Sequence, residues 1–384
     1  MILSDVTTST VTPTDSNDFV KTRVQELSRE LGFNLCRIGS CAAPAHAGEF
    51  REWLAAGEAG EMHYMERGEE KRCDPQQVLP GARSLIILAM NYWQGAHDSR
   101  PDGAAKGRIA RYAWGDDYHD VIAPKLESID GFLRECGGTQ KCYVDTGPVL
   151  ERDHAASAGV GWQGKSSMLI NTDLGTWFFL AEILTTLELP ADAPARERCG
   201  TCTRCITACP TGAITKPHHV DARKCISYLT IEHKTSIPTD LRPLIGDRIF
   251  GCDDCLDACP WNRFAEASRE SAFQAQSSTV NVPLRDYLSL TDEEFRQMFR
   301  KSPIKRIKRR GFLRNVCVAL GNVGEIGDLP ALELAAKDPE PLIAEHAQWA
   351  TDEIKRRAQR LSRSTQTNSA ESTEPPGRIL MKSS

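Results

Sequence analysis

The chain has 384 residues, enough for two or three domains, and a formal net charge of −5 at pH 7. Hydrophobic residues make up 40% of the chain and charged residues 26%, which is the composition of an ordinary globular protein. This weakly acidic balance excludes a strong attraction of the whole protein for nucleic acid. No run reaches the roughly 20 apolar residues of a membrane span, and the N-terminus lacks the features of a secretory signal.

The first half of the chain alternates apolar runs with amphipathic stretches, which indicates an α/β domain over residues 18–189. Residues 1–17 are rich in Ser and Thr and are expected to be disordered, and a helix should begin near Asp18. Strands are predicted at 84–90, 141–145 and 167–171. Helices are predicted at 49–56, 118–136 and 149–158, and the apolar segment 177–187 fits either state.

The composition changes at Pro190, where a connector leads into a cysteine-rich segment that ends near residue 270. The next region, 271–355, holds a strongly basic stretch at 300–314 and then two helical segments separated by Gly, Asp and Pro. These helices are similar to a single HEAT-like unit, which should pack on the rest of the protein because one unit cannot bury its own apolar face. The polar tail, 356–384, is expected to be disordered.

Eight of the fourteen cysteines form two sets that each end in C-x3-C-P. Without a secretory signal, thiolate ligands are a better interpretation of so many cysteines than disulfides. The first set is Cys199-x2-Cys202-x2-Cys205-x3-Cys209-Pro210, the spacing of two-cluster bacterial ferredoxins. The second set repeats the motif with a long insertion after its first cysteine, and it comprises Cys225, Cys252, Cys255 and Cys259.

In ferredoxins of this kind the cysteine before proline ligates the other cluster, so the fourth ligands are exchanged between the two sets. The first [4Fe–4S] cluster would then be held by Cys199, Cys202, Cys205 and Cys259. The second would be held by Cys209, Cys225, Cys252 and Cys255. Structural zinc, the main alternative, does not require two C-x3-C-P endings. The remaining cysteines have no ligand spacing and are expected to be buried thiols: Cys36, Cys41, Cys73, Cys136, Cys142 and Cys317.

Asp145 ends the predicted strand 141–145 and enters a Gly-Pro turn. Ligands bind at strand ends in α/β folds, and an acid placed there can supply a proton to a reduction if burial raises its pKa. The alternative is that Asp145 caps the following helix, and the spacing alone favours neither interpretation. The aromatic and polar run 111–119 is, by itself, most simply a loop and a helix entry.

Between Asp18 and Ile354 the chain resembles the epoxyqueuosine reductase family. Besides the two cysteine sets, the resemblance is carried by GEMHYMER (60–67), ARYAWGDDYHDVI (110–122), VDTGPVLER (144–152), GWQGKSSMLIN (161–171), CISYLTIEH (225–233) and RNVCVALGN (314–322). It implies an α/β (α+β) cobalamin-binding domain similar to that of reductive dehalogenases, at 18–189. A ferredoxin-like domain with two [4Fe–4S] clusters would follow at 190–270, and an all-α, HEAT-like, tRNA-binding region at 271–355.

The resemblance also implies an activity. The family reduces epoxyqueuosine to queuosine at the wobble position of tRNAs with a GUN anticodon, the last step of queuosine biosynthesis. Its cofactors are two [4Fe–4S] clusters and cobalamin, and an external low-potential electron donor is needed. A cytoplasmic monomer without a membrane partner is expected. Two alternatives are a cobalamin-dependent reductase of a small halogenated substrate, which a missing twin-arginine leader disfavours, and a non-catalytic iron–sulfur protein that binds RNA or carries electrons.

Several residues take roles by resemblance. Asp145 matches the family's proposed proton donor. His119 is not expected to ligate cobalt, because Ile122 stands where the D-x-H-x-x-G signature needs glycine, and no cysteine proton donor is expected within 108–122. The candidates for the corrin pocket are Arg67, Tyr112, Asp145, Lys165, Ser167, Ser227, Asp253 and Asp254. Glu232 and His233 are expected at the substrate entrance.

The basic stretch 300–324 contains no acidic residue, so it can follow tRNA phosphates. The candidates are Lys305, Arg306, Lys308, Arg309, Arg310 and Arg314. A solvated helix face explains such a run equally well before the resemblance is considered. The wobble base would have to leave its stack to reach a buried reductant.

Overall fold

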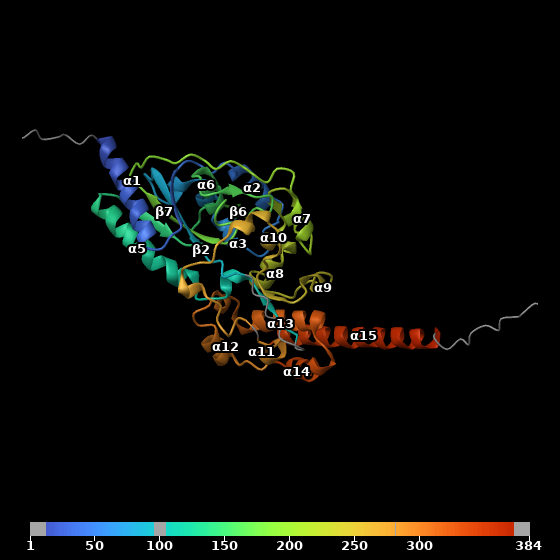
Figure 1. Cartoon of the computed structure of the whole chain (residues 1–384). Coiled ribbons are helices and arrows are strands. Elements are labelled where there is room, and N and C mark those ends of the chain that lie inside the picture. The colour runs from blue at the N-terminus through green and yellow to red at the C-terminus, as the bar shows by residue number, and fades with distance from the viewer. Residues whose placement is uncertain (1–12, 96–104, 281, 372–384) are drawn as a thin grey trace, which may run out of the picture.

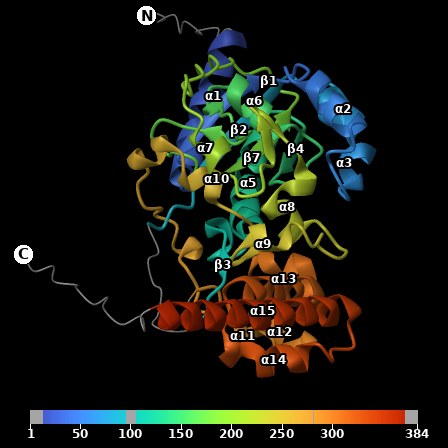
Figure 2. The same cartoon turned by 90° about the vertical axis from the view of Figure 1, so that its right-hand side faces the viewer.

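The protein is described from a computed structural model that covers residues 13–95, 105–280 and 282–371. A sheet with helices on both faces forms the upper part of Figure 1, and a group of helices lies below it. Figure 2 shows the same two levels from the side, with the cysteine-rich segment around α7 and α10 beside the sheet. None of the helices in the described ranges is long and apolar enough to cross a membrane.

The central sheet has the strand order β1-β2-β7-β4, and all of its pairings are antiparallel. The domain is therefore α+β rather than a parallel α/β unit. The predicted strand 84–90 is confirmed, and the ambiguous segment 177–187 forms a strand. The four strands are β1 (Leu35–Ser40), β2 (Ser84–Asn91), β7 (Phe178–Thr185) and β4 (Gln140–Tyr143).

Both faces of this sheet are covered, which explains why β2 is apolar along its whole length. Ile86 and Leu88 pack with α1 (Pro13–Glu30) and α5 (Tyr118–Glu135) on one face. Leu85 and Ile87 point to the opposite face, because strand side chains alternate, and pack with α6 (Glu151–Ser157). The predicted helix 118–136 is confirmed, whereas α1 begins at Pro13, before the predicted start at Asp18 and within the segment expected to be disordered.

Short elements connect and flank these layers. The predicted helix 49–56 is confirmed as α2, and the predicted strand 167–171 is reduced to β6. After β1 come α2 (Ala47–Ala55), α3 (His63–Arg67) and α4 (Glu69–Cys73), and later β3 (Arg108–Ile109), η2 (Arg111–Ala113), β5 (Trp162–Gln163) and β6 (Leu169–Ile170). The cysteine-rich segment holds α7 (Arg204–Ala208), β8 (Ile214–Lys216), β9 (His219–Val220), α8 (Ile226–Ile231), α9 (Arg242–Ile245), β10 (Arg248–Phe250), α10 (Asp254–Asp257) and η4 (Pro260–Phe264).

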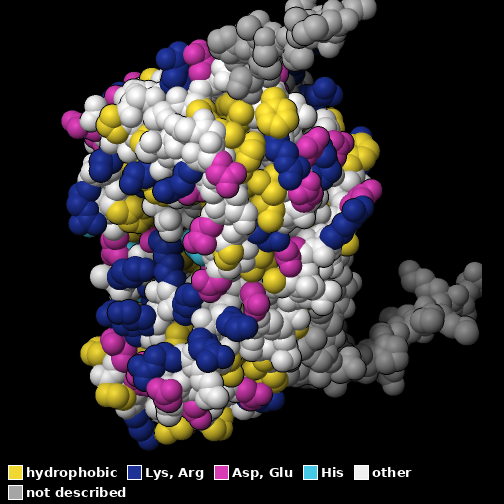
Figure 3. All heavy atoms as spheres, turned by 90° about the vertical axis from the view of Figure 1, so that its left-hand side faces the viewer, with side chains coloured by type: hydrophobic (Ala, Val, Ile, Leu, Met, Phe, Trp, Pro, Cys, Tyr) yellow, Lys and Arg dark blue, Asp and Glu magenta, His cyan; other side chains and the backbone are white. Residues whose placement is uncertain are grey.

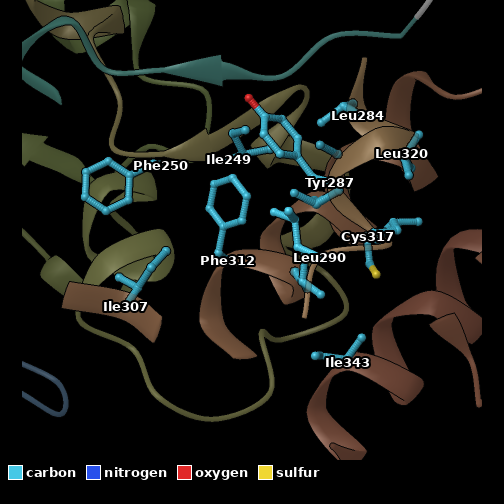
Figure 4. Close-up of a cluster of buried hydrophobic side chains, with 14 of the residues drawn as sticks. Ile249, Phe250, Leu284, Tyr287, Leu290, Ile307, Phe312, Cys317, Leu320 and Ile343 are labelled. Atoms are coloured by element: carbon cyan, nitrogen blue, oxygen red, sulfur yellow. The ribbon is translucent and has the colours of Figure 1, made fainter. Parts of the chain in front are cut away.

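The C-terminal helices pack around α13, of which residues 311–321 are all buried. Figure 4 shows Phe312 of α13 beside Tyr287, with ring centroids 5.1 Å apart, and near Ile249 and Phe250 of β10. The HEAT-like unit therefore packs on the cysteine-rich segment, as predicted. The elements are α11 (Leu284–Tyr287), α12 (Asp292–Met298), η6 (Pro303–Ile307), α13 (Lys308–Val323), α14 (Leu329–Ala335) and α15 (Pro341–Glu371).

The prediction of a disordered tail from residue 356 is wrong for its first part, because α15 continues to Glu371. Arg357 donates hydrogen bonds to the carbonyls of Gly321, Asn322 and Gly324 at the end of α13. These contacts satisfy carbonyls that a helix end leaves unpaired and hold α15 in place beyond the predicted boundary. The rest of the tail, 372–384, and residues 1–12 lie outside the described residues.

Candidate active site and cluster ligands

The eight motif cysteines come together in two groups. Burial raises the pKa of the Cys259 thiol, and the thiols of Cys199, Cys202 and Cys205 lie close enough to raise it further. Burial likewise raises the pKa of the Cys255 thiol, with further contributions from Cys225, Cys252 and Cys209. Each group thus joins three cysteines of one motif with the C-x3-C-P cysteine of the other.

The thiols in these groups form no disulfides, and they lie too far apart to bind one metal ion between them. Across the described residues no disulfide is formed, and no three His, Cys, Asp or Glu side chains are close enough to hold one metal ion. Backbone N–H groups point at several sulfurs: Ala213 donates to Cys209 Sγ over 3.3 Å, and Tyr228 and Ser227 donate to the Cys225 thiol. Such donors favour the thiolate form that a cluster requires.

The other six cysteines are only partly as predicted. Cys41, Cys73 and Cys317 are buried, whereas Cys36, Cys136 and Cys142 are partly buried. Burial raises the pKa of the Cys41 thiol to about 12, so this side chain is an inert apolar group.

Asp145 lies beyond the end of β4 in a left-handed conformation, with φ 58°. A non-glycine residue is strained there and is kept in place only by its surroundings. The alternative that Asp145 caps the next helix is wrong, because α6 begins after Leu150 and has no side-chain cap. Instead, the Tyr118 hydroxyl donates a hydrogen bond to Asp145 Oδ2 over 2.6 Å.

Polar side chains from five separate elements surround Asp145. Burial raises the pKa of Tyr112, and the nearby Asp145 carboxylate raises it further. Burial also raises the pKa of Tyr64, with Glu232 and Asp145 adding to the effect. Arg306 forms an ion pair with Glu232 at 2.5 Å. Burial lowers the pKa of Arg306, but the nearby Glu232, Tyr64 and Asp145 raise it by more. The site therefore combines two carboxylates, three phenols and a guanidinium.

Only some of the predicted corrin contacts gather at this site. Asp145 and Asp253 both lie near enough to Tyr112 to raise the pKa of its hydroxyl. Burial raises the pKa of Asp253 to about 6, although the Arg111 amide donates to it over 2.8 Å. Because Asp253 lies between Cys252 and Cys255 in the chain, this contact places the second cysteine group on the Asp145 side.

Other predicted corrin contacts are used elsewhere. Lys165 Nζ donates to the carbonyl of Gly200 over 2.6 Å, beside the first cysteine group. Asp254 forms ion pairs with Arg248 and Arg108. The structure does not bring these two side chains to Asp145.

The remaining candidates for the corrin pocket lie at three places. Arg67 is exposed at the end of α3. Ser167 has a left-handed backbone, and its carbonyl accepts from Arg152. Ser227 contributes its amide to the Cys225 thiol, so it belongs to the second cysteine group.

The basic stretch is largely neutralised by acids from elsewhere in the chain. Lys305 lies 2.9 Å from Asp117, Arg309 lies 2.5 Å from Asp338, and Arg310 lies 3.8 Å from Glu340. Lys308 is exposed. Figure 3 shows Lys and Arg side chains gathered on one half of its face, at the level where the C-terminal helices meet the sheet.

The prediction that Arg314 contacts tRNA is wrong. Its side chain is only 1% exposed, and burial lowers its pKa to about 10. The guanidinium donates to the carbonyls of Leu229, His233 and Thr235 and so ties α13 to the segment after α8. A side chain enclosed in this way cannot reach a phosphate.

Two histidines are held by neighbouring acids. His119 Nδ1 lies 2.7 Å from Asp117, and its ring stacks on Tyr118. His233 Nδ1 lies 3.3 Å from Glu61, and its Nε2 lies 2.9 Å from the Ser236 carbonyl.

Two family models match the chain. Residues 72–146 match the model described as "Epoxyqueuosine reductase QueG, DUF1730", and residues 198–262 match the "4Fe-4S double cluster binding domain". The epoxyqueuosine reductase of Xanthomonas campestris is 42% identical over 349 residues, which cover 88% of this chain and 96% of that protein. The enzyme of Escherichia coli is 39% identical over 351 residues, which cover 90% and 92%. The chain belongs to the epoxyqueuosine reductase family.

Solved structures of the epoxyqueuosine reductase family share the fold. One, crystallised with an epoxyqueuosine-modified tRNA-Tyr stem loop, is 30% identical and has a TM-score of 0.83, covering 88% of this chain and 90% of that one. A second, from Streptococcus thermophilus, is 27% identical with a TM-score of 0.80, covering 87% and 90%. Since the double-cluster match includes all eight motif cysteines, the prediction of two [4Fe–4S] clusters is confirmed.

Sequence reasoning about this epoxyqueuosine reductase family member missed several side chains near Asp145. Tyr118 and Tyr64 both lie inside motifs that carried the resemblance, yet neither was given a role. Glu151 and Glu182 were missed as well. The motif VDTGPVLER contains Glu151 six residues after Asp145, whereas nothing in the sequence marks Glu182, which is an acid within an apolar strand.

Proposed function

We propose that this protein reduces epoxyqueuosine to queuosine in the anticodon of tRNA, with electrons supplied through two [4Fe–4S] clusters to a bound cobalamin. The observation that carries the proposal is the position of Asp145. It accepts a hydrogen bond from Tyr118 and lies near Tyr112, and the amide of the adjacent Arg111 donates to Asp253 in the second cysteine group. Membership of the epoxyqueuosine reductase family then indicates which reaction such a site performs.

The grouping of the thiols supports the exchanged ligand sets. We assign Cys199, Cys202, Cys205 and Cys259 to one cluster and Cys209, Cys225, Cys252 and Cys255 to the other. Exposed arginines lie close in sequence to the cysteines of the first group, whereas Asp253 of the second group accepts the Arg111 amide next to Tyr112. Electrons from an external donor would therefore enter at the first cluster and leave from the second. The exposed arginines are Arg196, Arg198, Arg204 and Arg263.

The residues near Asp145 fit cobalamin in their chemistry. A corrin carries amide side chains that pair with hydroxyl, carboxylate and backbone groups, and Tyr112, Asp145 and Ser167 offer such groups. When bound, cobalamin supplies a strongly reducing centre for opening the epoxide. We also propose that the corrin is contacted by Arg67, Lys165, Ser227, Asp253 and Asp254.

Asp145 is the proposed proton donor to the epoxide oxygen. Tyr118 donates to Oδ2 and so fixes the orientation of the carboxyl group, which leaves Oδ1 to deliver the proton. Tyr112 and Tyr64 lie near this carboxyl group. Arg306, held by Glu232, lies between this site and the exposed basic residues and would position the flipped nucleotide.

A tRNA substrate is supported by the related structure with an anticodon stem loop. Lys305, Arg306, Lys308 and Arg310 are the exposed members of the basic stretch, and they are our proposed phosphate contacts, together with His233 near the entrance. Arg309 is mostly buried in its pair with Asp338, so we assign it a structural role. A cytoplasmic monomer is part of the same proposal.

The experiment that tests the function is reduction of an epoxyqueuosine-containing anticodon stem loop, read by nucleoside mass. Protein loaded with iron and cobalamin and supplied with a low-potential reductant is expected to convert epoxyqueuosine to queuosine. If the loaded, reduced protein leaves the nucleoside unchanged, the proposal is wrong. Protein loaded with iron alone is the matched control and should be inactive.

A further inference from the structure

Reduction of an epoxide to an alkene consumes two electrons and two protons. Both carbon–oxygen bonds break, the carbon–carbon double bond forms, and the oxygen leaves as water. The electrons come from the external donor through the clusters. Asp145 has one carboxyl group and can deliver one proton before it must be protonated again. A second proton must therefore reach the same place within each turnover.

A pair of carboxyl groups, one fully buried and one partly buried, lies near Asp145. Glu182 is in the middle of β7, between Tyr143 of β4 and Ile87 of β2, and its side chain is 1% exposed. Within the described ranges, neither of its carboxylate oxygens has a hydrogen-bond donor. The group beside it is the carboxyl of Glu151, the first residue of α6.

Two carboxyl groups can hydrogen-bond to each other only if one of them carries a proton. The Glu151 and Glu182 side chains are close enough for this bond, and burial keeps at least one of them protonated. Burial raises the pKa of Glu151 to about 7 and raises that of Glu182 well above its ordinary value. The pair is thus built to hold a proton at neutral pH.

The pair is also directly connected to Asp145. The backbone amide of Asp145 lies near enough to the Glu151 carboxyl to lower its pKa, and the Asp145 carboxylate raises the pKa of both glutamates. The charged and titratable groups that face the pair are Asp145 from the loop after β4, Arg152 from α6, Arg72 from α4 and Tyr143 from β4. The two arginines act only on Glu151, so among the residues that the structure describes Glu182 has no cationic partner.

We infer that Glu151 and Glu182 share a proton and pass it to Asp145 during each reduction, a role that rests on the proposed function. The first proton moves from Asp145 to the oxygen of the opening ring. The shared proton then moves from the glutamate pair to Asp145 and on to the same oxygen, which leaves as water. Glu151 and Glu182 are positioning residues that act through Asp145, and solvent protons refill the pair between turnovers.

The test compares Glu182→Gln and Glu151→Gln with wild type, and the control is Glu188→Gln, an exposed glutamate paired with Arg83. The single-turnover rate is measured on an epoxyqueuosine stem loop across pH. In the wild type the rate should be maintained through pH 7 and fall only at higher pH, where the last proton of the pair is lost, because the pKa of Glu182 is raised well above its ordinary value. Each Gln variant should be slower by about tenfold to a hundredfold and lose this dependence, with iron and cobalamin content unchanged. A wild-type profile in both variants would overturn the inference.

A second readout does not depend on turnover. The infrared band of a protonated carboxyl group, identified by its shift in heavy water, should be present at pH 7 in wild type and in Asp145→Asn. It should weaken in both Glu variants, and persistence of the full band in both would contradict a shared proton. If the wild type shows the band but does not reduce the stem loop, the proposed function fails while the shared proton stands.

Discussion

The cysteine-rich segment and the basic stretch both stand out in the sequence, but in the folded chain only the first makes the contacts that its sequence indicates. The eight cysteines gather into the two groups that motif spacing indicates. The basic residues, by contrast, meet Asp117, Glu232, Asp338 and Glu340, none of which is near them in sequence. A motif with fixed spacing specifies contacts, whereas a run of like charge specifies only a local composition.

Removal of a crossed ligand should give the largest effect and test this comparison most directly. Cys259→Ala is expected to abolish turnover and to reduce the iron content from about eight to about four atoms per chain. The lost cluster should be the one held by Cys199, Cys202 and Cys205, as judged by electron paramagnetic resonance. Cys136→Ala, a thiol outside both groups, is the control. Retention of both clusters in Cys259→Ala would refute the exchange of ligands.

Asp145→Asn should have the next largest effect, because it removes the transferable proton but keeps the side chain's shape. We expect turnover to fall by about a hundredfold or more, with iron and cobalamin bound as in the wild type. Single-turnover nucleoside analysis and absorption spectra would measure the two properties. Turnover at the wild-type rate would remove Asp145 from the mechanism.

Substitution of two residues in the basic stretch should distinguish a structural role from a role in RNA binding. Arg314→Ala leaves three carbonyls without their donor and should lower the free energy of unfolding by about 2–4 kcal/mol, seen in thermal denaturation. Lys308→Ala should leave the melting temperature unchanged but weaken tRNA binding and reduce its salt slope by about one. If Arg314→Ala were stable and only RNA binding suffered, our assignment of a structural role would be wrong.

The smallest expected effect is that of Tyr118→Phe, which removes the hydrogen bond to Asp145 Oδ2. Because Asp145 must be protonated to act as the donor, loss of this bond between neutral groups corresponds to about 0.5–1.5 kcal/mol, or roughly twofold to tenfold in rate. Substrate affinity should be unaffected, since the hydroxyl orients the acid rather than the RNA. A change in tRNA affinity without a change in single-turnover rate would place Tyr118 in binding instead.

The sequence by itself determined the features that depend on local spacing. The apolar run of β2, the amphipathic helix α5 and the two cysteine sets are where periodicity and motif placed them. It did not decide between helix and strand for 177–187, because β7 is apolar on both faces and shows no period.

Only the tertiary structure decided what depends on contacts between distant segments. It places Asp145 in a strained turn under Tyr118 rather than at a helix cap, and it encloses Arg314 among carbonyls. It also brings Glu151, at the start of α6, against Glu182 in the middle of β7. The physical reason is that strands pair and charged groups become buried only when the layers pack together. The spacing of residues along the chain therefore cannot predict these contacts.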